Sequence, residues 1–118
     1  MVELIACLST GKGTWIHVSK LIEGGEWDKV FLITNEFGKE NFTNKKNAEF
    51  ILIDTKKSLK ELREEIKDKI KDKIKGTEVA VNLISGVGKE HMALMSALLK
   101  LGLAIRFIAL TKEGVREV

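Results

Sequence analysis

The strongest constraint on the fold is a series of apolar runs that alternate with segments of helical periodicity. The runs are rich in β-branched residues and span residues 2–8, 29–34, 49–54, 78–84 and 104–110. They are mostly continuous rather than alternating, which is typical of strands covered on both faces, as in parallel sheets. We therefore expect right-handed crossovers and a three-layer α/β/α fold, Rossmann-like in the broad sense, with a mainly parallel sheet of five strands. The tail at 115–118 predicts a short sixth strand at an antiparallel edge.

Helical signals fill the intervals between these runs. Ser58, with Glu61 three residues later, predicts a capping box, and the apolar stripe that follows predicts a helix ending at Gly76. A first helix is expected at about residues 14–23. Residues 34–47 lack periodicity, which indicates a loop or a short helix that the pattern does not reveal.

The segment 89–102 predicts a helix that is apolar nearly all round, with Met92, Met95, Leu98 and Leu99 among small residues. Such a helix is either deeply buried or shared with a partner molecule. A chain of 118 residues has little interior in which to bury such a helix completely, so contact with a partner molecule is an important alternative.

Composition limits the classes of protein that fit. A length of 118 residues predicts a single domain spanning 1–118, and a net charge of +3 is too small to indicate nucleic-acid binding by bulk charge. No apolar run approaches the roughly 20 residues that span a bilayer, and the start does not resemble a signal peptide, so we expect a cytoplasmic protein without a membrane segment. Cys7 is the single cysteine and is expected in the core. Abundant Lys, Glu and Ile without Pro or Gln resembles the composition of proteins from heat-loving organisms.

Two Gly/Lys turns follow the first and fourth predicted strands, in "CLSTGKGTW" (7–15) and "NLISGVGKEHM" (82–92). In the Rossmann strand order 3-2-1-4-5 these strands are neighbours, and ligands bind at the carboxyl ends of the strands where the order reverses. Both turns open helices, whose N-termini favour anions. Lysine is unfavourable in a first helical turn, yet Lys12 and Lys89 both lie there, which predicts a shared anion site.

Neither turn fits a common nucleotide motif. A Walker P-loop would need glycine at Asn82 and a hydroxyl residue at Glu90. The dinucleotide-binding motif GxGxxG does not match either: Gly11 and Gly13 fit its first two glycines, but Ile16 occupies the third position, where a small residue is expected. NAD is therefore a weaker alternative ligand.

The fourth-strand turn, with its apolar helix, resembles the CRISPR-associated Rossmann-fold (CARF) domain family. The family turn runs Thr-Gly-Gly-Thr-Lys before a Met-containing helix. Here Ser85, Gly86 and Lys89 match, and Met92 falls close to the family methionine. The chain departs from the family where Val87 replaces the second glycine and Gly88 the threonine.

The resemblance implies a homodimer that binds cyclic oligoadenylate, the second messenger of type III CRISPR antiviral defence, in a cleft on the dimer axis. The ligand-binding residues then expected are Ser9, Thr10, Gly11, Lys12, Gly13, Ser85, Gly86, Val87, Gly88, Lys89 and Met92. As a sensor, such a domain acts on an effector, which is expected either as a separate protein or as part of a longer chain from which this domain is excised. No cofactor, metal or double-stranded nucleic acid is expected.

Two other functions remain open. The first is a ring nuclease that cleaves the same messenger without metal, through attack of a ribose 2′-hydroxyl, with Ser9, Thr10 and Lys89 stabilising the transition state. The second is a generic nucleotide or RNA binder.

Several other side chains have both a functional and a structural interpretation. Trp15 could stack on a base but is more typical of core, and the histidines His17 and His91 are expected at the surface or in caps rather than on a metal. Asn82, within an apolar strand, is expected to make a structural hydrogen bond. Further candidates at strand ends are Thr34, Asn35, Asp54 and Thr111.

Overall fold

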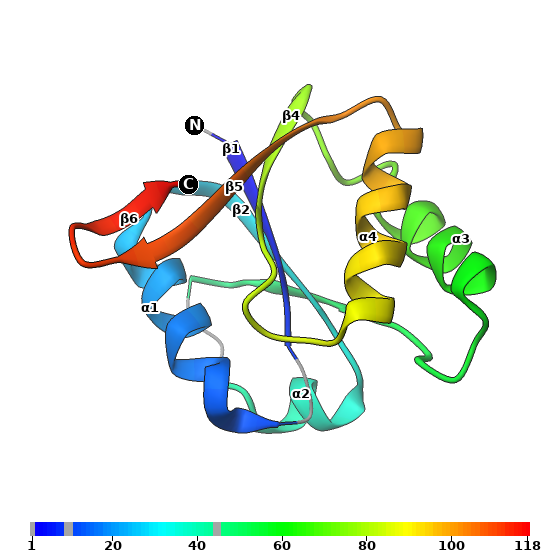
Figure 1. Cartoon of the computed structure of the whole chain (residues 1–118), viewed down its shortest axis with the longest axis horizontal. Coiled ribbons are helices and arrows are strands. Elements are labelled where there is room, and N and C mark those ends of the chain that lie inside the picture. Colours follow the sequence, from blue (N-terminus) through cyan, green and yellow to red (C-terminus); the bar gives the residue numbers. More distant parts are fainter. Residues whose placement is uncertain (1, 9–10, 44–45) are drawn as a thin grey trace.

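The described part of the chain folds around one six-stranded sheet in the order β3-β2-β1-β4-β5-β6 (Figure 1). The structure is a computed structural model and describes residues 2–8, 11–43 and 46–118. The strands are β1 (Val2–Cys7), β2 (Trp27–Thr34), β3 (Glu49–Leu52), β4 (Glu78–Asn82), β5 (Ala104–Thr111) and β6 (Gly114–Glu117). The first five are parallel, and β6 pairs antiparallel with β5. The predicted α/β class and the short sixth edge strand are confirmed.

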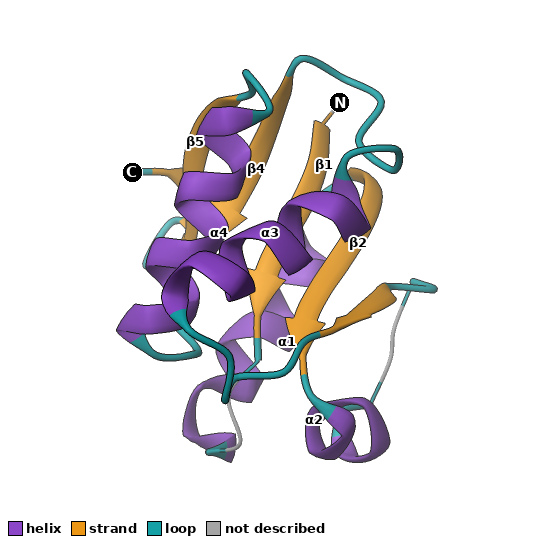
Figure 2. Ribbon diagram, turned by 90° about the vertical axis from the view of Figure 1, so that its right-hand side faces the viewer, coloured by secondary structure: helices purple, strands orange, loops and turns teal. Residues whose placement is uncertain are grey.

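Helices cover both faces of the sheet. They are η1 (Lys12–Thr14), α1 (Trp15–Gly24), α2 (Glu36–Asn41), α3 (Leu59–Ile70) and α4 (Gly88–Lys100). Helices α3 and α4 pack together on one face, and α1 packs on the other (Figure 2). The short helix α2 occupies part of the segment for which the pattern gave no element.

The two hydrophobic cores meet at β1, the strand between β2 and β4. Leu4 and Ala6 face α1, whereas Ile5 and Cys7 face α3 and α4, and all four side chains are inaccessible to solvent. This two-sided burial explains the continuous apolar run, because a strand with one wet face would alternate. Each fully buried Leu or Ile side chain contributes about 1.5–3 kcal/mol relative to exposure.

Helix α3 ends at Ile70, so the prediction that it continues to Gly76 is wrong. The carboxylate of Glu3 accepts hydrogen bonds from the backbone N–H groups of Lys75 and Gly76, each at 3.1 Å. This buried acceptor on β1 draws the chain away from the helix axis. The segment after Ile70 therefore becomes a loop, although Ile74 still packs against the core.

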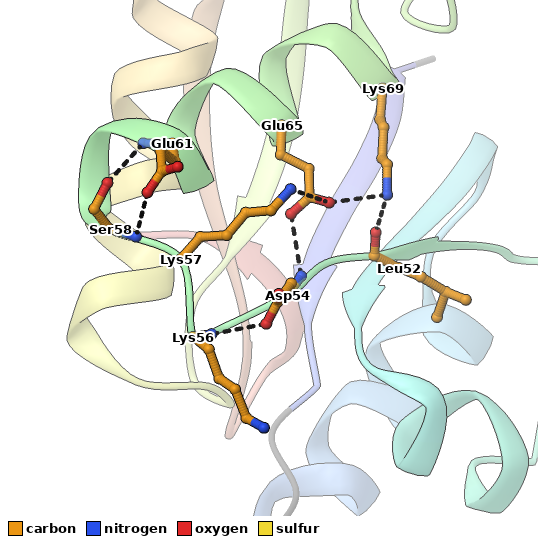
Figure 3. Close-up of polar contacts among 8 residues, drawn as sticks. All are labelled: Leu52, Asp54, Lys56, Lys57, Ser58, Glu61, Glu65 and Lys69. Atoms are coloured by element: carbon orange, nitrogen blue, oxygen red, sulfur yellow. Dashed lines mark hydrogen bonds and ion pairs between the residues drawn. The ribbon is translucent and has the colours of Figure 1, made fainter.

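The start of α3 is capped as the sequence predicts. The Ser58 hydroxyl accepts from Glu61 N–H at 3.3 Å, and the Glu61 carboxylate accepts from Ser58 N–H at 3.2 Å. These reciprocal bonds satisfy two backbone donors that the helix itself leaves without acceptors (Figure 3).

Glu65 attaches the loop between β3 and α3 to the helix (Figure 3). Its carboxylate accepts from Asp54 N–H at 3.1 Å and forms ion pairs with Lys57 at 3.2 Å and Lys69 at 3.3 Å. Burial opposes its ionisation, but the Asp54 N–H and the two ammoniums outweigh that effect and lower the pKa of Glu65. The loop after β3 is thereby fixed at the carboxyl end of the sheet.

Within the described residues, no helix has the length and apolar character needed to cross a bilayer.

Replacing Glu65 by alanine should cost about 1–2 kcal/mol of unfolding free energy, because Asp54 N–H loses its acceptor and two lysines lose their partner. Glu64→Ala is the matched control, since Glu64 is 45% exposed against 13% for Glu65 and pairs with surface groups. It should change stability by less than about 0.5 kcal/mol. Urea denaturation measures both.

The penalty for Glu65→Ala should also depend on pH. A group with a lowered folded-state pKa contributes its full stability above the ordinary glutamate pKa and loses it as the pH falls through the lowered value. Equal destabilisation by both variants at neutral pH, or a Glu65→Ala penalty that grows in acid, would contradict this assignment.

Candidate functional site

Both Gly/Lys turns leave the sheet at the same edge, from adjacent strands. β1 and β4 are parallel neighbours, with Ala6 opposite Asn82 in the register. Their carboxyl ends therefore open side by side, as the predicted strand order requires, and the loops that follow lie at the bottom of Figure 1. We call this edge the carboxyl rim. Ser9 and Thr10 lie outside the described residues.

The β4 turn is fixed from inside by Ser85 and Gly86. Ser85 is 1% exposed, and its carbonyl accepts a hydrogen bond of 2.8 Å from His91 Nε2. Gly86 has φ +101°, in the left-handed region that favours glycine, and a Cβ there would lie 2.9 Å from His91 Nε2 and 3.0 Å from Cys7 Cβ. Gly86 is thus required by the backbone, and His91 has a structural role.

Glu90 turns inward beneath the same turn. It is 9% exposed, and Val87 N–H donates to its carboxylate. Burial raises the pKa of this carboxyl above its ordinary value, although the Val87 N–H and His91 favour the charged form. The acidic group of the first turn of α4 therefore faces the protein interior.

The remaining turn residues point toward solvent at the start of α4. Val87 is 54% exposed, Met92 is 61% exposed, and a Cβ added at Gly88 would meet no other atom within 4 Å. Lys89 is exposed and reaches over the rim, where Nζ donates to the Thr55 carbonyl in the β3–α3 loop at 3.0 Å. Lys89 thus bridges two loops of the carboxyl rim.

The β1 turn is exposed throughout its described residues, Gly11, Lys12 and Gly13. The Lys12 ammonium lies 5.8 Å from the centroid of Trp15 and 5.6 Å from that of Phe37, which is on α2. Because α2 follows β2, the β1 turn extends along the rim away from β4. Lys12 and Lys89 therefore approach the carboxyl rim from the two faces of the sheet.

The helices that begin at the two turns differ from the other two in their N-terminal caps. Asn35 caps α2 through Gly38 N–H at 3.0 Å, and Ser58 caps α3. The N-cap residues of α1 and α4, Thr14 and Val87, make no side-chain cap bond, and neither does Gly11 at the start of η1. The positive ends of these helices are thus left without a side-chain acceptor from the N-cap residue.

Two residues of the first turn region belong to the core. Trp15 is 8% exposed and packs against Phe42 at 5.7 Å, which confirms that it is a core residue rather than a base-stacking one. Burial raises the pKa of the Cys7 thiol to about 12, with a smaller contribution from the Glu90 charge. Cys7 is therefore a neutral core residue, as expected.

Asn82 and His17 join β4 to α1 and β5. Asn82 Nδ2 donates to the Ile108 carbonyl at 2.8 Å and lies 3.3 Å from His17 Nε2, while its Oδ1 accepts from Ile84 N–H at 3.2 Å. Leu110 N–H also points at His17 Nε2, at 3.4 Å. Both side chains are structural, which confirms the interpretation of Asn82.

The other strand-end candidates also have structural partners. Thr34 Oγ1 donates to the Leu8 carbonyl at 3.1 Å, and Asp54 Oδ1 accepts from Lys56 N–H at 3.0 Å. Thr111 Oγ1 donates to the Gly114 carbonyl at 2.9 Å. With Asn35 at the cap of α2, these side chains shape the carboxyl rim.

A cavity of about 900 Å³ lies at the opposite edge of the sheet. It is lined by Val2, Glu3, Asp28, Lys29, Phe31, Glu49, Asp72, Lys73, Lys75, Gly76, Thr77 and Glu78. Carboxylates outnumber ammoniums in this lining, and several of its charges have partners, such as Lys73 with Glu49 and Arg106 with Glu78. The cavity is therefore a poor site for an anion.

Sequence reasoning missed Phe37, which lies in the segment without periodicity. Its ring is 40% exposed at the carboxyl rim, beside Lys12. The available signal was an aromatic residue two positions after Asn35, the helix-capping residue that follows the end of β2.

In the described ranges, no group of three or more His, Cys, Asp or Glu side chains is arranged to hold a metal ion. No protein-family model matches this chain, and the comparison with curated proteins finds no match.

The roles of the two glycines in the β4 turn can be separated by substitution. Gly86→Ala should lose about 1–3 kcal/mol of stability, because φ +101° strains any L-residue and the added Cβ meets Cys7. Gly88→Ala, in open space at the start of α4, should change stability by less than about 1 kcal/mol, with stabilisation the more favoured sign. Thermal unfolding by circular dichroism compares them, and equal melting temperatures would contradict the assignment.

Proposed function

We propose that this chain binds cyclic oligoadenylate at the carboxyl rim, as a sensor module in type III CRISPR defence. The observation that carries the proposal is that two glycine- and lysine-bearing turns follow neighbouring parallel strands at one edge of the sheet, each before a helix whose N-cap residue makes no side-chain cap bond. Phosphate oxygens are suitable acceptors for N–H groups at such positions. The resemblance of the β4 turn to the CARF family supports a cyclic adenylate as the ligand.

The charges of the carboxyl rim are consistent with this proposal. Lys12 and Lys89 extend over solvent-exposed turns, and each has a neutral partner, aromatic rings for Lys12 and a carbonyl for Lys89. A phosphate can replace either contact with a stronger, charge-assisted one. Glu90, the acidic residue of the β4 turn, is directed away from this surface.

A second copy of the chain is part of the proposal, since a ligand with rotational symmetry fits a symmetric site. Met92 and Leu99 are one heptad apart on the solvent side of α4 and are 61% and 65% exposed. Phe107, 40% exposed, lies on the sheet face of Ile105, which packs against the α3–α4 core. These side chains supply an apolar surface along α4, the helix that begins at the β4 turn. A cytoplasmic location and a separate effector protein complete the proposed role.

Isothermal titration calorimetry with cyclic tetra-adenylate and cyclic hexa-adenylate tests ligand binding. We expect heat with one of them, and we expect Lys89→Ala to weaken binding about ten-fold or more through loss of a charge-assisted hydrogen bond. Lys100→Ala is the matched control, because Lys100 lies at the far end of the same helix, and it should leave affinity unchanged. Absence of heat with both ligands at high micromolar concentration would refute the proposal.

The same preparation distinguishes the alternatives. Linear products from labelled messenger in EDTA, lost in Lys89→Ala, would show that the chain is a ring nuclease. Affinity for mononucleotides or RNA equal to that for the cyclic ligand would instead indicate a generic nucleotide binder.

Size-exclusion chromatography coupled to light scattering tests whether the protein forms a dimer in solution. Leu99→Glu should convert a dimer to a monomer, because it places a charge in the apolar surface that the proposal buries. Ile16→Glu is a control of equal exposure, 65%, on the opposite face, and should stay dimeric. A wild-type monomer at 100 micromolar would contradict this part of the proposal.

A further inference from the structure

Phe37 is a partly exposed aromatic residue at the carboxyl rim. It is 40% exposed, and its ring centroid lies 6.0 Å from that of Trp15, with the planes inclined at 52°. Trp15 in turn packs edge-on against Phe42 at 5.7 Å. The exposed ring therefore rests on a buried aromatic pair that belongs to the core.

The backbone beneath Phe37 is equally constrained. Asn35 caps α2, and Gly38 approaches Thr34 so closely that a Cβ at Gly38 would lie 1.9 Å from Thr34 Oγ1. Thr34 is itself tied to the end of β1 through the Leu8 carbonyl. These contacts hold α2, and with it Phe37, against the ends of β1 and β2.

A cation lies beside the exposed ring. The Lys12 ammonium is 5.6 Å from the Phe37 centroid and 5.8 Å from the Trp15 centroid, within the range of cation–π attraction. An exposed cation–π contact contributes little to the stability of the fold, so the Lys12 ammonium can leave the rings for a stronger partner. A planar apolar surface with an adjacent exposed ammonium matches the two parts of a nucleotide, its base and its phosphate.

We propose that Phe37 is the base-stacking residue of the site, and that Lys12 leaves the aromatic rings to bind the phosphate next to the stacked base. The proposal rests on the proposed function and adds a base subsite to it. Trp15 supports the Phe37 ring from behind rather than stacking on the ligand. Each copy of the chain then recognises one adenylate unit by its base at α2 and by its phosphate at the β1 turn.

Affinity for cyclic tetra-adenylate in the variants Phe37→Leu and Phe37→Trp tests this assignment. Leucine keeps apolar bulk without a flat π surface, so binding should weaken about five-fold to a hundred-fold, whereas tryptophan should retain the wild-type affinity or improve it. Both variants should melt near the wild-type temperature, because each keeps an apolar side chain against Trp15.

Intrinsic fluorescence gives an independent measurement on the unmodified protein. Trp15 contacts both Phe37 and Lys12, while Trp27 lies near the other end of α1, where its Nε1 donates to the Leu21 carbonyl at 3.1 Å. Ligand binding should change the emission of Trp15, and the change should persist in Trp27→Phe.

The outcomes separate this inference from the proposed function. Binding by the wild type with unchanged affinity in Phe37→Leu would overturn the stacking role and leave the proposed function intact. Absence of binding by the wild type to the cyclic ligand, in calorimetry and in fluorescence, would overturn both. Weaker binding by Phe37→Leu together with retention in Phe37→Trp would establish the stacking role.

Discussion

The parallel pairing of β1 with both β2 and β4 is the constraint on which the rest of the structure depends. β1 is buried on both faces, and its two neighbours leave the sheet in the same direction. The pairing with β4 places turns more than 70 residues apart in sequence at one edge. The pairing with β2 places α2, and with it Phe37, next to the β1 turn.

The carboxyl rim contains two kinds of residue: polar side chains with hydrogen-bond partners inside the protein, and groups exposed to solvent. Nearly every polar side chain near its base has an internal partner: His91 holds Ser85, Asn82 joins β4 to β5, Thr34 ties β2 to β1, and Glu65 fixes the β3–α3 loop. The surface of the same edge includes the glycines of the two turns, Lys12, Lys89 and the partly exposed ring of Phe37. A rigid site with small and cationic groups favours anion binding. Its loops are already ordered in the folded protein, so little conformational entropy is lost when the anion binds.

The sequence predicted the fold better than the details of the site. Strand positions followed from the apolar runs, which are strongest in the well-buried strands β1, β2 and β4. The strand order was taken from the Rossmann pattern, and the structure confirms it. The Ser58–Glu61 capping box was predicted equally well, because both residues lie within one turn of the chain. The early end of α3 was not predicted, because the acceptor that causes it, Glu3, lies more than 70 residues away in sequence.

Long-range contacts also explain the errors at the site. Phe37 was missed because it lies in a segment without periodicity, and only its packing against Trp15 in the folded chain places it at the carboxyl rim. The partner of Lys89, the Thr55 carbonyl, belongs to a loop of another crossover. Gly86 and Gly88 look alike in sequence, and their different backbone requirements emerge only from the folded turn.

The central claim is that the two turns form one ligand site, and selective ¹⁵N-glycine labelling tests it most directly. Glycine amides report from both turns, at Gly11, Gly13, Gly86 and Gly88, and from the opposite edge of the sheet, at Gly25, Gly76 and Gly102. Titration with cyclic tetra-adenylate should shift the first group together, with one affinity, and leave the second unchanged. Shifts confined to one turn, or centred on Gly76 beside the cavity at the opposite edge, would contradict the claim.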